Sequence, residues 1–350
     1  MSAITEVPIL KRVYWETTAA CNLRCIHCRR IDVLNKISPE EINLEEACQI
    51  IDDLASMGHP VFILSGGEPL YRKDIFEIAA YAKSKGLPVA LSTNGTLVTQ
   101  EIARKAKEAG IYYASISLDG GSARTHDYFR GQGMFARAIL GLKNLQSAGI
   151  KVQINFTITK QNVNELQQIY DLSCELKAHA LYLFLLVPVG CGIQIATTQM
   201  LSPEEVEKQL EWIDNKQEEK KIEVRAICAP QYYRVSEQRK GNQSSAGKPR
   251  LGCLAGINIC FISHKGDVFP CGYLPAKIGN IKETPISELW KNSAEFRSLR
   301  DPNLLEGKCG ICGFKEICGG CRARGYYPSG NILAEEPYCL YEPANLFLRR

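Results

Sequence analysis

The sequence has no long apolar run and little net charge. No stretch approaches the roughly 18 consecutive apolar residues that a membrane-spanning helix needs. Residues 1–6 also lack the basic-then-apolar pattern of a secretion signal. Lys and Arg total 42 against 38 Asp and Glu, a formal net charge of +4, which does not by itself indicate nucleic-acid binding. We therefore expect a cytoplasmic protein with no membrane or nucleic-acid partner.

Cysteine, by contrast, is abundant. The chain has 15 cysteines in 350 residues, and an odd number cannot be fully paired in disulfides. In a reducing compartment, cysteines at this density are typical of metal ligands. Eleven lie in or near CxxC-like groups, and four stand apart: Cys48, Cys174, Cys191 and Cys228. With 45% hydrophobic and 23% charged residues, the chain is long enough for one large and one smaller domain.

Three cysteines follow a strand-like run at residues 12–18, spaced CxxxCxxC: Cys21, Cys25 and Cys28. Three thiolates can bind three corners of a four-iron, four-sulfur (4Fe–4S) cube and leave one iron open, whereas a structural zinc needs a fourth ligand. His27 is a candidate for that fourth ligand, but it lies between two cysteines and should point away from a metal that they share. The spacing therefore favours a cluster with an open iron over a zinc site.

A repeated unit follows this loop. Helical patterns end near Gly58, Gly86, Gly110 and Gly149, and an apolar strand begins after each glycine. A further strand at 181–187 and a helix from Ser202 bring the count to six βα units, short of the eight of a closed barrel. We predict an α/β fold, a partial (β/α)6 barrel over residues 1–222, followed by a small cysteine-rich domain over 223–350. The polar run 239–250 is predicted to be a mobile loop or linker.

Polar residues gather where the predicted strands end. Ligands bind at the carboxyl ends of parallel strands, and these ends carry residues 65–69, 92–95 and 117–120, with Asn155 and Thr157 on the fifth strand. Glycine lets the backbone approach a ligand, carboxylates accept from amines or hydroxyls, and Arg130 can pair with a carboxylate. Each of these loops taken alone is equally consistent with an ordinary βα turn and with a ligand-binding loop. Together, on the rim that carries the cysteines, they indicate a shared site.

CxxxCxxC combined with Gly66-Gly67-Glu68-Pro69 resembles the radical S-adenosylmethionine (radical SAM) enzymes. Their three-cysteine cluster binds the amino and carboxylate groups of S-adenosylmethionine (AdoMet) at its open iron. The resemblance implies that residues 66–69 hold the amino group, that Ser117 and Arg130 contact the carboxylate, and that Asn94 and Asp119 lie nearer the ribose. The full set of expected cofactor-binding residues is His27, Gly66, Gly67, Glu68, Pro69, Asn94, Ser117, Asp119, Arg130 and Asn155.

A second group of cysteines occupies the last hundred residues, and its eight members can hold two 4Fe–4S clusters or two zinc ions. Their order, with Gly266-x4-Cys271 before a four-cysteine block, resembles the SPASM extension of radical SAM enzymes. The block ends in x2-Cys321 where many members have x3. The resemblance implies one auxiliary cluster on Cys253, Cys260, Cys271 and Cys321, and another on Cys309, Cys312, Cys318 and Cys339. A zinc-ribbon binding module is the non-enzymatic alternative.

Segments 228–234, 252–256, 261–264, 318–324 and 333–339 resemble the heme b synthase family of the siroheme-dependent heme pathway. The resemblance implies oxidative decarboxylation of two propionates of Fe-coproporphyrin III to vinyl groups. It also implies three 4Fe–4S clusters and an external low-potential electron donor. Such a tetrapyrrole carries four carboxylates, so we expect two of five arginines to bind it: Arg29, Arg30, Arg234, Arg322 and Arg324.

Two alternatives stay open at this point. One is a related tetrapyrrole enzyme, a deacetylase of the 12,18-didecarboxysiroheme type. The other is a radical maturase of a ribosomal peptide. Peptide maturases often carry a domain that grips a leader strand, and the position of Cys21 leaves little room for one before the barrel, which disfavours the second alternative.

Overall fold

The structure is a computed structural model and describes residues 7–30, 36–242, 244 and 246–343. Within these residues, ten strands form one sheet in the order β10-β9-β8-β1-β2-β3-β4-β5-β6-β7. The strands are β1 Arg12–Glu16, β2 Val61–Ser65, β3 Val89–Thr93, β4 Ile111–Ser117, β5 Lys151–Ile158, β6 Ala180–Leu185, β7 Glu223–Ile227, β8 Ile259–Ile262, β9 Asp267–Phe269 and β10 Gly279–Asn280.

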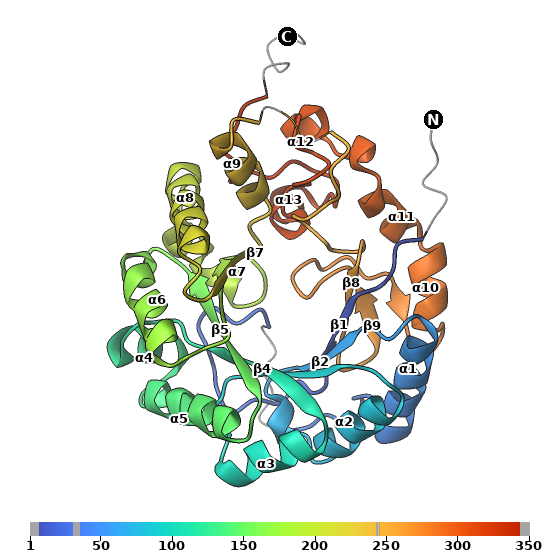
Figure 1. The fold of residues 1–350 in the computed structure, drawn as a ribbon. Helices are drawn as coiled ribbons and strands as arrows, with labels where there is room; N and C mark the ends of the chain where they lie inside the picture. Colours follow the sequence, from blue (N-terminus) through green and yellow to red (C-terminus); the bar gives the residue numbers. More distant parts are fainter. Residues whose placement is uncertain (1–6, 31–35, 243, 245, 344–350) are drawn as a thin grey trace.

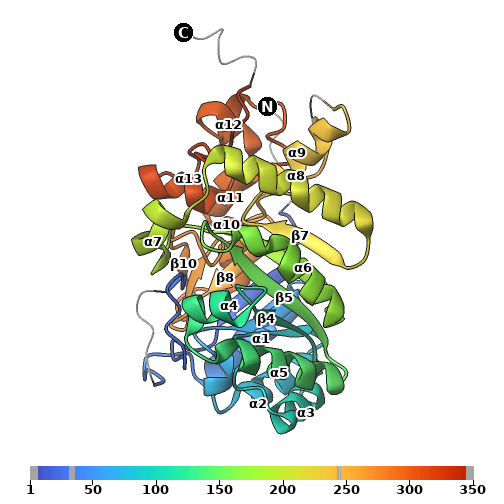
Figure 2. The same ribbon diagram turned by 90° about the vertical axis from the view of Figure 1, so that its left-hand side faces the viewer.

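The helices lie mostly on the outer face of this curved sheet, and α11 to α13 lie together at one end of the molecule (Figures 1 and 2). They are α1 Leu44–Ser56, α2 Ile75–Ser84, α3 Gln100–Glu108, α4 Ala123–Arg130, α5 Met134–Ser147, α6 Leu166–Glu175, α7 Gly192–Gln199, α8 Pro203–Glu219, α9 Gln231–Arg239, α10 Ile286–Asn292, α11 Ala294–Arg300, α12 Gly307–Ile311 and α13 Arg322–Ser329. Three short 3-10 turns are η1 Pro69–Tyr71, η2 Val163–Glu165 and η3 Pro302–Leu304.

The structure confirms the predicted partial barrel. The helix starts and ends that the sequence indicates are also present. Strands β1 to β6 are parallel, each hydrogen-bonded to the next. Helix α1 begins with a capping box, in which Asn43 and Glu46 each accept from the other's backbone N–H. Gly86 and Gly110, after α2 and α3, have φ of +82° and +94°, which suits the left-handed residue that ends a helix.

The C-terminal part of the chain extends the same sheet at both edges. β7 lies beyond the predicted boundary at residue 222 and pairs in parallel with β6. β8 pairs in parallel with β1 on the opposite side, and β9 and β10 follow as antiparallel strands. An open barrel leaves unpaired backbone groups at its edges, and these strands pair with them. The sheet therefore continues across residue 222, and the predicted domain division stays a prediction.

The core lies between the sheet and the helices, where Trp15, Phe62, Phe156 and Trp290 are buried in one cluster. This buried cluster extends from α1 to α11, so the C-terminal part packs against the barrel. No helix among the described residues is both apolar and long enough to cross a membrane.

The polar segment 239–250 contacts two other regions of the C-terminal part, the loop at Glu316 and helix α9. Residues 243 and 245 lie outside the described residues. Elsewhere in the segment, Gly247 N–H donates to the Glu316 carboxylate at 2.8 Å, and Arg250 Nε donates to Glu316 O at 3.1 Å. Lys248 pairs with Glu237 on α9. These contacts attach the segment at several points, and its mobility stays a prediction.

Candidate active site

The first cysteine loop begins at the carboxyl end of β1. Cys25 and Cys28 lie near enough to Cys21 to raise its pKa, and Cys28 lies near enough to Cys25 to raise that pKa. Burial raises the pKa of Cys25 to about 11; Arg130 opposes that shift and Cys28 adds to it. The Leu23 N–H reaches the Cys21 sulfur at 3.4 Å. The structure thus brings the three thiols together on one loop.

The loop after β2 packs directly on this cysteine loop. Gly67 N–H donates to Thr18 O and Glu68 N–H to Ala20 O, each at 2.8 Å. A β-carbon on Gly67 would lie 2.7 Å from Ala19 O and closer still to Ala20 O, so the approach requires glycine. Residues 66–69 therefore support the cysteine loop, and their contact with the amino group of AdoMet stays a prediction.

Glu68 connects the loops after β2 and β3. Its buried carboxylate accepts from Thr93 Oγ1 at 2.7 Å, Asn94 N–H at 2.8 Å and Leu70 N–H at 3.2 Å. Burial raises the pKa of Glu68 to about 7, because these hydrogen bonds offset the desolvation only in part. Asn94 Nδ2 in turn donates to Asn22 Oδ1 at 2.9 Å, within the cysteine loop. Both expected cofactor residues thus make loop-to-loop contacts.

Asp119, after β4, is the centre of a buried charged group. One carboxylate oxygen accepts from Thr157 N–H at 2.8 Å, and the other lies 3.0 Å from His27 Nε2 and accepts from Arg130 Nε. Burial opposes its ionisation, but Arg130 and His27 outweigh burial and hold the pKa of Asp119 well below its usual value. Arg130 Nη1 reaches the Cys25 sulfur at 3.6 Å. His27 therefore points to Asp119, and its contact with the cofactor stays a prediction.

Ser117 and Asn155 lie side by side on neighbouring strands. They are register partners on β4 and β5, so their half-buried side chains share one face of the sheet. Ser117 is the last residue of β4, two residues before Asp119, and Asn155 lies beside it within β5, near the rim where the sequence predicts the cofactor.

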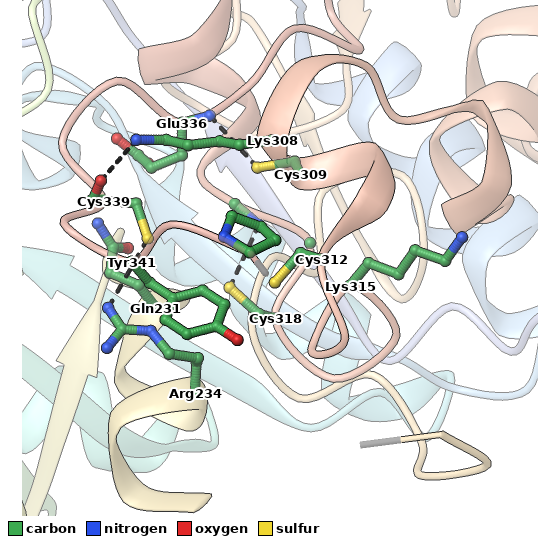
Figure 3. A pocket seen from close by; sticks show the side chains of 13 residues that line it. Gln231, Arg234, Lys308, Cys309, Cys312, Lys315, Cys318, Glu336, Cys339 and Tyr341 are labelled. Carbon is green, nitrogen blue, oxygen red and sulfur yellow. Dashed lines mark hydrogen bonds between the residues drawn. The ribbon is translucent and has the colours of Figure 1, made fainter. Parts of the chain in front are cut away.

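In the C-terminal part, four cysteines line one pocket with Arg234 and Lys308 (Figure 3). Each sulfur has a nearby N–H donor, a feature typical of cluster-binding thiolates. The distances are 3.4 Å from Glu336 N to Cys309, 3.4 Å from Phe314 N to Cys312, 3.4 Å from Gly320 N to Cys318, and 3.7 Å from Arg234 Nη2 to Cys339. This is the group that the SPASM resemblance implies.

The close approach of Gly320 and an unpaired hydrogen-bond donor on Arg322 fit an anionic cluster at this pocket. A β-carbon on Gly320 would lie 3.1 Å from the Cys309 sulfur. Arg322 Nη2 is buried there without a hydrogen-bond partner among the described residues. No three His, Cys, Asp or Glu side chains of the described chain are arranged to hold a single metal ion.

The remaining group differs from the expected one. Cys253, Cys271 and Cys321 lie near one another, as expected, but Cys260 does not join them. It is fully buried in the main hydrophobic core, because its strand turns that side chain toward the helices. Cys228, at the end of β7, lies among the three instead. The one sequence signal for Cys228 was its place in a segment that resembles heme b synthases.

Family models match both halves of the chain. The radical SAM superfamily model matches residues 15–173, and the SPASM iron-sulfur cluster-binding domain model matches residues 253–322. An AdoMet-dependent heme synthase of Methanosarcina barkeri (strain Fusaro) is 46% identical over 98% of this chain and 99% of its own. The chain belongs to the radical SAM superfamily. It is an enzyme of the SPASM-containing branch and uses AdoMet and iron-sulfur clusters.

Other relatives of this radical SAM enzyme are more distant. The Fe-coproporphyrin III synthase of M. barkeri is 36% identical over 93% of this chain and 87% of its own. Mycofactocin maturase MftC of Mycobacterium tuberculosis is 32% identical over 94% and 83%. Streptococcus suis SuiB bound to its precursor peptide has a TM-score of 0.75 at 18% identity, covering 95% of this chain and 76% of SuiB. That structure shows the fold alone.

Four of the five arginines expected to offer donors to a substrate have partners inside the protein. Arg324 pairs with Glu336 at 2.9 Å, both 1% exposed, and Arg322 donates to the Ala334 carbonyl at 2.7 Å. Buried Arg234 and Arg30 pair with Glu207 and Glu16. These four are therefore held by partners inside the protein, because an arginine this deeply buried needs such compensation.

Arg29 is the one of the five with an appreciably exposed side chain, 20%. It pairs with Glu16 at 2.7 Å and lies over the Phe261 ring at 4.5 Å. Of the predicted carboxylate partners, the structure leaves Arg29 as the accessible candidate.

Proposed function

We propose that the enzyme decarboxylates two propionates of Fe-coproporphyrin III to vinyl groups and so produces heme b. The observation that carries this proposal is the 46% identity, over nearly all of both chains, to a heme synthase of M. barkeri. A second relative in that organism, named for making Fe-coproporphyrin III, is only 36% identical. Fe-coproporphyrin III is the product expected of the deacetylase alternative. Of two relatives from one organism, the chain is thus more similar to the heme synthase, which supports that function over the deacetylase.

When bound, AdoMet at the first cluster supplies a radical that removes a hydrogen atom, and an auxiliary cluster supplies a one-electron acceptor. The chain's residues prepare that site. Asp119 and Arg130 hold the cysteine loop against the strand ends, and the cationic Arg130 next to Cys25 favours its thiolate form. Burial of His27 and Asp119 keeps water from this side of the loop.

In the C-terminal part, Arg234 places a cationic donor beside the Cys339 sulfur, as Arg130 does beside the Cys25 sulfur. Its Nη2 lies 3.7 Å from the sulfur, and Glu207 orients the guanidinium through two hydrogen bonds. Charge-assisted donors to sulfur raise the reduction potential of a cluster, which suits an electron acceptor. We assign Arg234 to this cluster rather than to a substrate carboxylate.

The proposal includes three 4Fe–4S clusters and an external low-potential electron donor for the first of them. It places the enzyme in the cytoplasm, where a reducing environment keeps its cysteines available as ligands. It names Fe-coproporphyrin III as the tetrapyrrole partner.

The test is anaerobic incubation of the reconstituted enzyme with AdoMet, a reductant and single tetrapyrroles, followed by mass spectrometry. Fe-coproporphyrin III should lose two propionate carboxylates as carbon dioxide, together with two hydrogen atoms and two electrons, while 12,18-didecarboxysiroheme stays unchanged. Loss of acetate side chains from 12,18-didecarboxysiroheme instead would assign the deacetylase reaction. If no tetrapyrrole changes while 5′-deoxyadenosine still forms, the substrate proposal is wrong.

A further inference from the structure

Four cysteines of the C-terminal part that lie outside the pocket of Figure 3 fall into two different environments. Cys321 is buried in a small cluster with Val187 and Leu274, and Cys271 and Cys228 pack against that cluster. Cys260 belongs to the main core instead, with Val13 and Trp290. A fourth ligand for Cys253, Cys271 and Cys321 must come from the first environment.

The register of β1 and β8 shows why Cys260 faces away. The pairs are Val13↔Cys260 and Tyr14↔Phe261, and side chains alternate between the two faces of a sheet. Tyr14 lies within electrostatic range of Cys228 and Cys271. The face of Tyr14 and Phe261 is therefore the cysteine face, and Cys260 lies on the other.

Contacts of Phe261 support this assignment. A β-carbon on Gly272, next to Cys271, would lie 3.2 Å from the Phe261 ring. Turning Cys260 toward Cys271 requires a one-residue slip of β8, which would move Phe261 into the core face and Ile262 out of it. The buried pairing with β1 opposes such a slip.

Cys228 sits where three loops meet. It follows β7 directly, and a β-carbon added to Gly252, the residue before Cys253, would lie 2.8 Å from Pro230, two residues after Cys228. Cys253 N–H donates to Cys318 O at 2.9 Å, which brings in the loop that ends at Cys321. Cys321, Cys271 and Cys253 all lie within electrostatic range of the Cys228 thiol.

We propose that Cys228, Cys253, Cys271 and Cys321 are the ligands of the first auxiliary 4Fe–4S cluster, and that Cys260 is a core residue. Cys228 lies outside residues 253–322, the segment that matches the SPASM model. The ligand set therefore joins the last barrel strand to the C-terminal part. The inference rests on the presence of an auxiliary cluster, as in the proposed function, and not on the substrate.

A hydrogen-bond donor without a partner lies beside these proposed cysteine ligands. Arg324 Nη1 is buried and has no hydrogen-bond partner within the described chain, although its other nitrogens bond Glu336 at 3.0 and 2.9 Å. Glu336 also accepts from Cys321 N–H at 3.0 Å, so it holds the guanidinium beside a ligand. Both Cys228 and Cys321 lie in electrostatic range of Arg324. Cluster sulfides accept hydrogen bonds from such donors.

The test uses the full chain with Cys21, Cys25 and Cys28 replaced by alanine, so that only auxiliary clusters assemble, about eight irons in all. Cys228→Ala is added to this background, and Cys260→Ala serves as the matched control. Iron and sulfide content and electron paramagnetic resonance are measured without AdoMet or substrate, before and after brief mild oxidation. Failure of this test is thus separate from failure of the proposed function.

A 4Fe–4S cluster with three protein ligands loses its unligated iron on oxidation. Cys228→Ala should therefore lose about one iron per chain and show a three-iron cluster signal, or lose the whole cluster, while Cys260→Ala keeps the background content. Cys228→Gly should behave like Cys228→Ala; since Cys228 has φ of +52°, glycine relieves the backbone there and guards against misfolding. Unchanged clusters in both Cys228 variants, or loss confined to Cys260→Ala, would overturn the proposal.

Discussion

Arg130 connects the Asp119 carboxylate to the Cys25 sulfur, with Nε on the carboxylate and Nη1 3.6 Å from the sulfur. The two residues come from the loop after β4 and from α4, whereas the cysteine follows β1. The charge of the cysteine loop is therefore balanced by elements more than ninety residues away in the chain. Because Asp119 also contacts His27, removal of its charge should disturb the loop from two sides.

Asp119→Asn should destabilise the protein by about 3 to 5 kcal/mol, because it leaves Arg130 buried without a counter-charge. Iron bound at the first cluster should fall as well. Urea unfolding and iron analysis measure the two effects. Glu101→Gln is the control, since Glu101 pairs with Lys105 on an exposed face of α3 and its loss should cause no measurable change. Equal effects of both variants would contradict the role of the buried pair.

Gly67→Ala should abolish AdoMet cleavage while the C-terminal clusters assemble. The added carbon meets the backbone of Ala19 and Ala20, so the cysteine loop must shift. Release of 5′-deoxyadenosine and iron content are the measurements. In Gly133→Ala nothing lies within 4 Å of the added carbon, and only the backbone at φ +77° is strained. That control should keep its cleavage activity, and normal cleavage by Gly67→Ala would disprove the close packing.

Glu68 should make the metal-free protein less stable as the pH rises from about 4.5 to 7. Burial raises its pKa from 4.5 to about 7, so over this window the folded state holds a proton that the unfolded state has lost. The effect is complete near pH 7, and amounts to about 3 kcal/mol on the scale of 1.36 kcal/mol per pKa unit.

The measurement is the free energy of unfolding of wild type minus that of Glu68→Gln at several pH values. Burial lowers the pKa of His126 to about 4, so the contribution of His126 to stability rises with pH. Both proteins carry His126, and its contribution cancels in the difference. A difference that stays constant between pH 4.5 and 7 would show that Glu68 keeps an ordinary pKa.

Replacing Cys309 and Cys312 together should stop heme formation but leave 5′-deoxyadenosine formation measurable. Loss of carbon dioxide from a propionate radical gives a vinyl group only if one electron also leaves, and the cluster that these residues would hold is the proposed acceptor. Both products are followed in one anaerobic assay, with circular dichroism to verify folding. Heme formed at the wild-type rate would make this cluster structural and assign the electron to an external acceptor.

The sequence alone was enough for the features that depend on neighbours in the chain. The spacing of Cys21, Cys25 and Cys28 places three thiols on one loop in any fold. The glycines after helices mark the βα units, because the left-handed helix end is a local preference. Parallel strands align their carboxyl ends, so the meeting of Glu68, Asn94 and Asp119 at one rim followed from the repeat.

Only the tertiary structure decided which face of the sheet a side chain lies on and which residues it pairs with. Cys260 faces the core because the register of β8 on β1, a contact across more than two hundred residues, turns it there, and packing after β7 brings Cys228 near Cys253, Cys271 and Cys321. The arginines beside the cysteines looked like substrate donors, but four of them are buried against carboxylates or carbonyls. Burial and pairing arise from long-range packing, and no local pattern in the chain carries that information.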